Sequence, residues 1–292
     1  MDQKEAKNAR IEKLVEMVNK SQMASIQNIV SGITKIINDP KSSAKDLKAV
    51  IQIDPPLTGK LLKLANSVYY SPLTKISEIQ KAVIWVGYDA LKELALSQKV
   101  CEAFAGDTDI EGYSRNLLWK HSVAVALLGK MIYRREFGRK GDNIYVAGLL
   151  HDIGIIALDQ FCQDDFGLIL SKTKTEKKNQ TTAEKKVLGF DHTEVGEAIT
   201  DSWNLPQELI QIIKYHHNPD TIAREFARPG LTLYVADYVC QQKRVGYRDA
   251  PVPDRRLFMR CLKRLELSSY AIEIIFKDVE QELLKMEEQG LL

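Results

Sequence analysis

The sequence predicts an all-α fold, a helical bundle with an N-terminal helical lobe. Apolar residues recur at steps of three or four along nearly every segment, which is the period of one face of a helix. Helix-capping patterns interrupt this periodicity at several points. No run of alternating apolar and polar residues is long enough to predict a strand.

The first helices can be placed from their apolar faces and their caps. Residues 26–37 carry isoleucine and valine at helical spacing, and the Asn-Asp-Pro turn at 38–40 ends that helix. Ser43, with Asp46 three residues later, predicts the cap of the next helix. Asp54 directly precedes a proline, which suits an N-cap followed by proline in the first turn. These signals predict three consecutive short helices.

Later helices follow from the same kinds of signal. Ser77 and Gln80 form a capping-box pattern before an apolar stretch that Gly87 interrupts. The C-terminal helix is expected from Ser268 to about Gln289, and its apolar side either packs on the body or pairs with a partner helix. That side consists of Ala271, Ile274, Ile275, Val279, Leu283 and Leu284.

Polar stretches divide the chain. At 105–114 small and acidic residues replace the apolar pattern, and this seam predicts two units, an N-terminal helical lobe at 1–110 and a second lobe with the C-terminal helix at 111–292. Residues 171–186 contain six lysines. Such a run is expected to be a solvated loop or helix face, with an anion-binding patch as the rarer alternative. A third loop spans 246–256.

The composition predicts a bacterial-type cytoplasmic protein. With 41 basic and 39 acidic residues the net charge is +2, so electrostatics favours neither nucleic acid nor a membrane as partner. The polar, charged N-terminus is not expected to be a signal peptide, and the most apolar window, residues 144–158, is expected to be too short to span a bilayer. The four cysteines form no CxxC pair, which argues against a zinc ribbon and fits reduced thiols.

The five histidines are the most informative residues of the chain. They stand in the phrases HSVAVA, HDIG, DHTEVG and YHHNP, and a further aspartate follows in LYVADYV. Imidazole is the commonest metal ligand among side chains, and a carboxylate can bridge two cations. Asp152 interrupts an apolar helix, where a buried carboxylate is costly unless it binds a metal or pairs with Arg or Lys. The alternative is a set of scattered helix histidines. As a whole the set predicts a site for two metal ions, made of His121, His151, Asp152, His192, His216, His217 and Asp237.

The order of these motifs resembles the HD superfamily of metal-dependent phosphohydrolases, with a lone His, then His-Asp, then a downstream Asp. The histidine of DHTEVG and the His216-His217 pair resemble the HD-GYP branch, whose members hold two or three metals and hydrolyse cyclic dinucleotides. Residues 54–97 are similar to the opening of an HDOD domain. The residues that carry this similarity are Asp54, Pro55, Leu57, Thr58, residues 64–67, Tyr69, Tyr70, Ile79, Ala82 and Gly87. The resemblance extends from about residue 22 to about residue 240 and implies an HD-like helical bundle.

The resemblance to the HD superfamily also implies an arrangement of the metal ligands. The first metal would be held by His121, His151, Asp152 and Asp237. Asp152 would bridge to a second metal, held by His192, His216 and His217. Histidine and carboxylate donors without thiolate suit two divalent ions, with iron as the first expectation and manganese or zinc as alternatives.

Two departures from the HD-GYP pattern argue against efficient hydrolysis. Ile155 stands where those enzymes carry a lysine directly after His-Asp-Ile-Gly, and no Asp-Gly-x-Gly-Tyr-Pro loop follows the histidine pair. The lysine would supply a fixed cation for a phosphate oxygen, and such charge stabilisation is usually the largest catalytic contribution. Lys120 and Lys214 lie near the ligands in sequence, but each is expected to be solvated.

Three functions remain open. The resemblance to HDOD domains implies a metal-containing signalling or regulatory module that binds a signalling protein or a nucleotide with little or no turnover, and we favour this function. The second is a metal-dependent phosphohydrolase acting on a nucleotide or cyclic dinucleotide, for which the ligand set is competent. The third is a metal-free interaction domain with relic histidines.

The N-terminal lobe carries large aromatic residues near the loop YYSPLTK. These are Tyr69, Tyr70 and Trp85. Buried aromatics dominate many cores, whereas exposed ones are enriched where partners dock. The sequence therefore leaves open whether these three residues belong to the core or to a binding surface.

Overall fold

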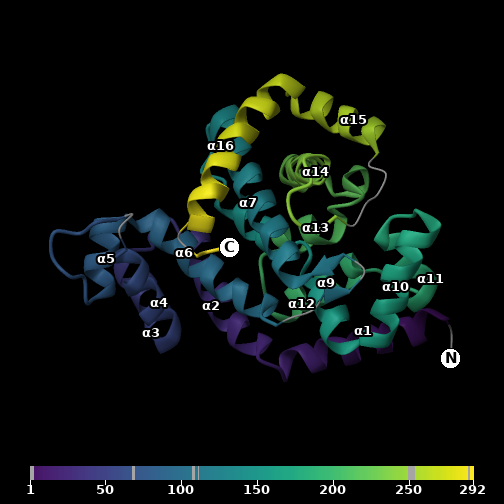
Figure 1. The fold of residues 1–292 in the computed structure, drawn as a ribbon, viewed down its shortest axis with the longest axis horizontal. Helices are drawn as coiled ribbons and strands as arrows, with labels where there is room; N and C mark the ends of the chain where they lie inside the picture. Colours follow the sequence, from purple (N-terminus) through teal and green to yellow (C-terminus); the bar gives the residue numbers. More distant parts are fainter. Residues whose placement is uncertain (1–2, 68–69, 107–108, 111, 249–253, 289) are drawn as a thin grey trace.

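A computed structural model describes residues 3–67, 70–106, 109–110, 112–248, 254–288 and 290–292, and these residues form an all-α fold (Figure 1). The predicted fold class is confirmed. The α-helices are α1 (Gln3–Asn19), α2 (Met23–Asn38), α3 (Ala44–Gln52), α4 (Pro55–Ala65), α5 (Ile79–Val86), α6 (Tyr88–Cys101), α7 (Arg115–Phe137), α8 (Asp142–Leu150), α9 (Ile153–Phe161), α10 (Gln163–Glu176), α11 (Gln180–Leu188), α12 (His192–Ser202), α13 (Gln207–Tyr215), α14 (Ala227–Gln242), α15 (Arg255–Leu265) and α16 (Ser269–Glu288). Short 3-10 turns are η1 (Glu102–Phe104), η2 (Pro219–Thr221) and η3 (Arg224–Phe226). At the predicted seam, β1 (Asp109–Ile110) pairs antiparallel with β2 (Tyr113–Ser114).

The caps of the first helices confirm most of the sequence signals. Ser43 and Asp46 form a complete capping box at the start of α3. The Asp54 carboxylate accepts a hydrogen bond from the backbone N–H of Leu57 at 2.9 Å, with proline in the first turn of α4. The capping box predicted from Ser77 is wrong, because the N-cap of α5 is Glu78 and this shifts Gln80 off the third helical position.

Helix α7 lies at the centre of the fold, and α8, α14 and α16 pack against it. The apolar stretch extends beyond the window 144–158 that was expected to be too short for a bilayer. Asp142–Phe161, which comprises α8, α9 and their junction, is long and apolar enough to cross a membrane, yet 89% of its apolar window is buried inside the protein. That burial is typical of a core element of a folded chain. The His151–Asp152 pair lies at the junction between α8 and α9.

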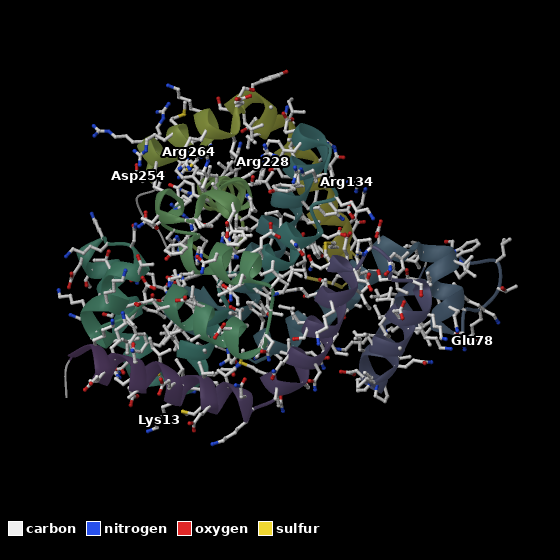
Figure 2. All side chains as sticks on the ribbon, turned by 180° about the vertical axis from the view of Figure 1, so that it is seen from behind. Lys13, Glu78, Arg134, Arg228, Asp254 and Arg264 are labelled. Atoms are coloured by element: carbon white, nitrogen blue, oxygen red, sulfur yellow. The ribbon has the colours of Figure 1, made fainter. Side chains whose placement is uncertain are left out.

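Helices α3, α4 and α5 pack on one another and on α6, and they project to one side of the molecule (Figure 1). Viewed from behind, Glu78 lies at the outer part of this lobe, far from Arg264 on α15 (Figure 2). Helix α1 lies away from α3–α5 and packs on α9 and α12. The division into units 1–110 and 111–292 stays a prediction.

The C-terminal helix begins and ends close to the predicted bounds and packs on α7. Its buried face is rotated slightly from the predicted one, because Ile272 and Phe276 are buried whereas Ile274 and Leu284 are exposed. The backbone N–H of Ala271 donates to the Ser268 hydroxyl at 3.0 Å, which fixes the start of the helix. Gln289 lies outside the described residues.

Candidate metal centre

The seven residues singled out in the sequence lie together, although they come from distant parts of the chain. His121 and Asp237 project from α7 and α14, and His192 is the first residue of α12. Two dipeptides, His151–Asp152 and His216–His217, follow the last residues of α8 and α13. Six of the seven residues are at most 3% exposed. The side chain of His217, at 22% exposed, is the one through which the cluster reaches the surface.

The junction of α8 and α9 brings Asp152 close to the start of α12. The apolar pattern predicted one helix with a polar interruption, but the structure contains two helices that end and begin around His151–Asp152. Gly154 permits this approach, because a Cβ atom there would lie 2.0 Å from the carbonyl oxygen of His192. The glycine of the HDIG phrase therefore allows the backbones of α9 and α12 to touch.

The start of α12 is fixed by its own capping box. The Asp191 carboxylate accepts from the backbone N–H groups of Thr193 and Glu194, while the Glu194 side chain accepts from the N–H of Asp191. The fully buried Glu184 then holds His192, accepting from its backbone N–H at 2.8 Å and from its Nδ1 at 2.7 Å. Glu184 was missed in the sequence because it lies within the lysine-rich stretch and carries no motif of its own.

Four imidazoles are each held by a hydrogen bond at Nδ1. The Nδ1 atoms of His151 and His216 lie 2.8 Å and 2.6 Å from the carbonyl oxygens of the residues three positions earlier. The Nδ1 of His121 lies 3.3 Å from the carbonyl oxygen of Val245, and that of His192 faces Glu184. Carbonyl and carboxylate oxygens only accept hydrogen bonds, so Nδ1 carries the proton and Nε2 is directed away from it. Metal-binding histidines are held by such second hydrogen bonds.

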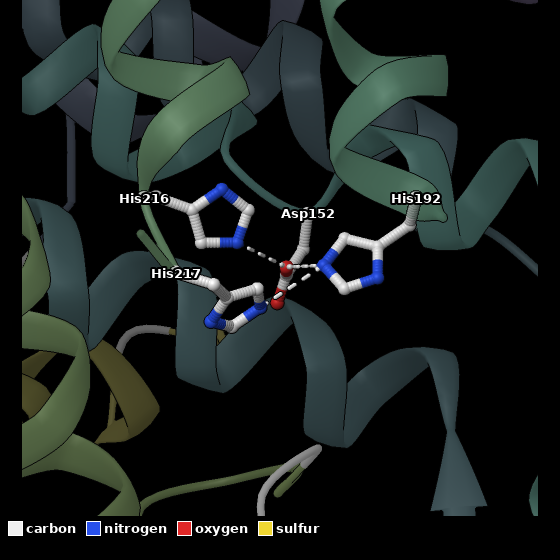
Figure 3. A group of neighbouring side chains, drawn as sticks. All are labelled: Asp152, His192, His216 and His217. Carbon is white, nitrogen blue, oxygen red and sulfur yellow. Dashed lines mark hydrogen bonds and ion pairs between the residues drawn. The ribbon is translucent and has the colours of Figure 1, made fainter. Parts of the chain in front are cut away.

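The Nε2 atoms of His192 and His216 point toward the carboxylate of Asp152 (Figure 3). One carboxylate oxygen of Asp152 lies 3.1 Å from His151 Nε2, and the other lies 3.5 Å from His192 Nε2 and 3.6 Å from His216 Nε2. His192 and His217 bring their Nε2 atoms to 3.1 Å. Two groups able to hold a metal ion result, one of His121, His151 and Asp152 and one of Asp152, His192, His216 and His217. Asp237 joins the first group through a 3.0 Å contact with His121 Nε2.

Unsatisfied atoms at the centre fit a bound cation. His151 Nε2, His216 Nε2 and Asp152 Oδ1 are buried and have no hydrogen-bond partner among the described residues. A buried polar atom without a partner costs about 1–3 kcal/mol, and more if it is charged. A divalent ion between these atoms would satisfy them, and the nitrogen and oxygen donors suit iron, manganese or zinc. The buried cluster can therefore bind metal, whereas the role of each residue as a ligand stays a prediction.

Burial and neighbouring charged groups together set the pKa values of the cluster residues. Burial opposes the charged form of His151, but the neighbouring Asp152 carboxylate raises the pKa of this imidazole to about 9. Burial likewise opposes a charge on His192, but Glu184 raises its pKa to about 10. Burial and the adjacent His217 lower the pKa of His216 to about 4. Burial would raise the pKa of Asp152, yet His151 holds it well below its usual value. The protons on His151 and His192 therefore occupy nitrogen atoms that a metal ion would need.

Lys120 and Lys214, which lie near the ligands in sequence, are each paired with a glutamate. Lys120 forms an ion pair with Glu287 on α16 at 2.5 Å, and Lys214 forms one with Glu197 on α12 at 2.7 Å. Ile155 is fully buried within α9. The described part of the site therefore holds no lysine in the place of the HD-GYP cation.

Comparison with known proteins places the chain among helical HD-like domains. The model of the HDOD domain family matches residues 23–219. An HDOD domain protein of unknown function from Geobacter sulfurreducens has a similar structure, with a TM-score of 0.75 at 28% identity over 90% of this chain and 91% of that one. A candidate signal transduction protein from Marinobacter aquaeolei VT8 aligns with a TM-score of 0.74 over 90% of this chain and 58% of that one. At 19% identity, this second likeness shows the fold alone.

Two curated relatives match shorter parts of the chain. An uncharacterized protein from Treponema pallidum (strain Nichols) is 26% identical over 189 residues, which are 64% of this chain and 36% of that protein. Ribonuclease Y from Thermus thermophilus is 27% identical over 164 residues, which are 56% of this chain and 23% of the enzyme. The matched region thus spans about a third or less of each relative's own length.

Proposed function

The chain belongs to the HDOD family, and from this premise we propose that it is a signalling module whose dinuclear metal centre supports binding of a signalling protein or a nucleotide, with little or no turnover. The HD-like helical fold and the buried His/Asp cluster support a regulatory module of this kind. The small net charge gives no electrostatic reason to expect nucleic acid or a membrane as the partner.

The observation that carries the proposal is the closure of the metal centre. Asp152, which would bridge the two ions, is 2% exposed, and of the seven cluster residues only His217 is substantially accessible. A hydrolase must bring a phosphodiester next to the metal pair, whereas a structural or regulatory centre needs no such access. Burial of the bridge, together with the fully buried Ile155 in the place of the HD-GYP lysine, supports regulation over turnover.

In this role the ions would join helices that are far apart in the sequence. His121, His151, Asp152 and Asp237 would hold one ion, and His192, His216 and His217 would hold the other together with Asp152. The bound pair would supply Lewis acidity and a fixed positive charge. The protein's own contribution is to orient the imidazoles through Nδ1 and to keep bulk water from the bridge.

Elemental analysis of the purified protein tests the metal, and a phosphodiesterase assay tests the lack of turnover. We expect about two transition-metal ions per chain, by the count of donors. Metal-loaded protein should hydrolyse cyclic di-GMP at least 100-fold more slowly than an HD-GYP enzyme, because losing one charge-stabilising contact typically costs about 10²–10³ in rate. Less than a tenth of an equivalent of metal, with no uptake of iron, manganese or zinc, would contradict the metal centre.

The second candidate is a metal-dependent phosphohydrolase acting on a nucleotide or cyclic dinucleotide. The unsatisfied nitrogen and oxygen atoms and the similarity to ribonuclease Y favour it. Turnover of cyclic di-GMP within tenfold of an HD-GYP enzyme would establish it in place of the regulatory module. Replacing Ile155 by lysine is a poor way to restore activity, because a lysine at this fully buried position would lack solvent and a counter-ion.

A further inference from the structure

We propose that a pocket beside the metal centre binds a small phosphate-bearing ligand, and that binding there is coupled to the metal centre. The pocket has a volume of about 390 Å³ and lies between the C-terminal part of α10 and the segment Gly246–Arg248. Cavities that hold small ligands typically measure about 300–1,000 Å³, so a nucleotide-sized molecule is of the right scale. This inference rests on the proposed function, because the pocket would bind the nucleotide that the proposed function expects.

The lining of the pocket is cationic. Lys174, Lys177 and Arg248 are among its lining residues, and the described lining residues include no carboxylate. Lys177 and Arg248 form no ion pair with a described residue, so these two side chains are the ones expected to bind an anion. The Nε atom of Arg248 is buried and has no hydrogen-bond partner among the described residues. Because a buried N–H group without an acceptor is costly, the unpartnered guanidinium nitrogen indicates an anionic ligand.

Lys177 lines the pocket from the C-cap of α10. Its φ of 50° lies in the left-handed region at the C-terminus of α10, where glycine or asparagine would be favoured. Lys177 forms no ion pair with any described residue, whereas the adjacent Lys178 pairs with Glu176 at 3.3 Å. Within the lysine-rich stretch, Lys177 therefore lines the pocket without an ion pair, whereas the neighbouring Lys178 is paired with Glu176.

The wall of the pocket is continuous with the metal centre. A Cβ atom on Gly246 would lie 2.3 Å from the carbonyl oxygen of Leu117 and 2.6 Å from the backbone nitrogen of His121, so this wall lies directly against α7. The backbone N–H of Tyr247 donates to the same carbonyl of Leu117 at 2.9 Å. A ligand that shifts Gly246 or Tyr247 would therefore shift the helix that carries His121.

A buried chain of hydrogen bonds forms a second connection. The Tyr247 hydroxyl donates to Gln180 Oε1 at 2.5 Å, and Gln180 Nε2 donates to Glu184 at 2.8 Å. Glu184 in turn accepts from His192 Nδ1 at 2.7 Å. Gln180, Glu184 and His192 are all fully buried. Because each partner has little freedom to move, displacement of Tyr247 would reach the imidazole of His192.

Isothermal titration with pyrophosphate, AMP and cyclic di-GMP tests the site. Arg248→Gln and Lys177→Gln should each weaken binding at least tenfold, since a hydrogen bond to a charged group contributes about 1.5–3 kcal/mol. Lys178→Gln removes the same charge from the same loop outside the pocket and should change affinity less than twofold. Equal affinities in wild type, Arg248→Gln and Lys178→Gln, or no binding at millimolar ligand, would overturn the pocket.

The choice of ligands separates two sources of phosphate. Binding of AMP or cyclic di-GMP at least tenfold tighter than pyrophosphate supports a nucleotide, whereas equal affinities support a free phosphate or diphosphate ligand of the same site. Metal content is measured on the same samples. Two ions without anion binding would overturn this inference and leave the proposed metal module intact. Anion binding to a protein that takes up no metal would overturn the metal module and leave the pocket.

Gln180→Leu tests the coupling, because Gln180 connects the Tyr247 hydroxyl to Glu184 and is not a lining residue of the pocket. In the wild type, saturating AMP, which chelates divalent ions far more weakly than pyrophosphate, should change metal affinity about fivefold or more, as is usual for linked sites. The variant should bind AMP within threefold of wild type but lose most of that change. Circular dichroism checks that it folds. Metal affinity that is the same with and without AMP in the wild type would overturn the coupling.

Discussion

The metal centre and the α3–α5 lobe depart from the usual burial pattern in opposite directions. In the centre, imidazole and carboxylate groups of residues such as His151 and Asp152 are at most 2% exposed. In the lobe, large apolar side chains reach the solvent, with Leu73 94% exposed, Ile84 84% exposed and Ile53 72% exposed. Buried polar atoms need a partner such as a cation, whereas exposed apolar surface often marks a docking site. The two regions therefore call for different tests, metal binding for the centre and the role of exposed side chains for the lobe.

The aromatic residues of the lobe illustrate the contrast. Trp85 is 45% exposed, and its indole N–H donates to the backbone carbonyl of Tyr70 at 2.8 Å. Tyr70 is half-buried, and Tyr69 lies outside the described residues. Of the two possibilities that the sequence left open, the position of Trp85 favours the surface. Amphipathic aromatic side chains with one satisfied polar atom are common in binding surfaces.

The largest predicted effect is the loss of both metal ions on removal of the bridging carboxylate. Asp152 lies in both groups of potential ligands, whereas His121 lies in only one. Asp152→Ala should therefore lose both ions and His121→Ala mainly one, as measured by elemental analysis of folded protein. Equal metal retention in the two variants would show that Asp152 is not a bridge.

The next effect concerns the close approach of α9 and α12. Gly154→Ala would place a Cβ atom 2.0 Å from the carbonyl oxygen of His192, so the helices must move apart. We expect a loss of about 3 kcal/mol in the free energy of unfolding, at the upper end of typical overpacking costs, together with weaker metal binding. Gly167→Ala in α10 is the matched control, because a Cβ atom there would meet no atom of the described residues within 4 Å apart from its own helix backbone and chain neighbours. The control should be neutral or gain up to about 1 kcal/mol. Similar stability of the two variants would contradict the tight contact.

Much of this architecture is predictable from local sequence signals. The caps at Ser43 and Asp54 were predicted because their partners lie three residues away along the chain. The Asp191–Glu194 box, which positions His192, has the same local signature and could have been found in the same way. Glu184 could not be found, because its role depends on the packing of α11 against α12 and on no local pattern.

The break between α8 and α9 could not be predicted for a similar reason. Residues 142–161 form one apolar stretch without proline, so periodicity alone predicts a single helix. The helices separate where the side chains of His151 and Asp152 turn toward residues of α7 and α12 and toward the His216–His217 pair that follows α13. Tertiary contacts thus override a local preference at the candidate site, which is where such conflicts are expected.

A pH dependence of metal binding is the third prediction. The raised pKa values of His151, about 9, and His192, about 10, stabilise the metal-free protein fully below about pH 6.5. That contribution is lost as pH rises through 9 and 10. A cation needs the nitrogen atoms that these protons occupy, so metal affinity should rise between pH 6.5 and 9 by about tenfold per unit for each displaced proton. Titration calorimetry at pH 7 in buffers of different ionisation enthalpy should show about two protons released. Affinity that is constant with pH would contradict the assignment of these imidazoles.

The smallest predicted effect tests the exposed lobe through two isoleucines of the same helix. Ile79 is 2% exposed and Ile84 is 84% exposed, and both lie on α5. Ile79→Ala should lower the free energy of unfolding by about 2–4 kcal/mol, because it leaves a cavity in the core of the lobe. Ile84→Ala should change it by less than about 0.5 kcal/mol, because water already surrounds most of that side chain. Chemical denaturation of both variants gives the comparison directly. A cost above about 2 kcal/mol for Ile84→Ala would mean that this side chain packs within the chain itself. In that case the lobe would follow the ordinary burial rule, and the contrast with the metal centre would not indicate a docking site.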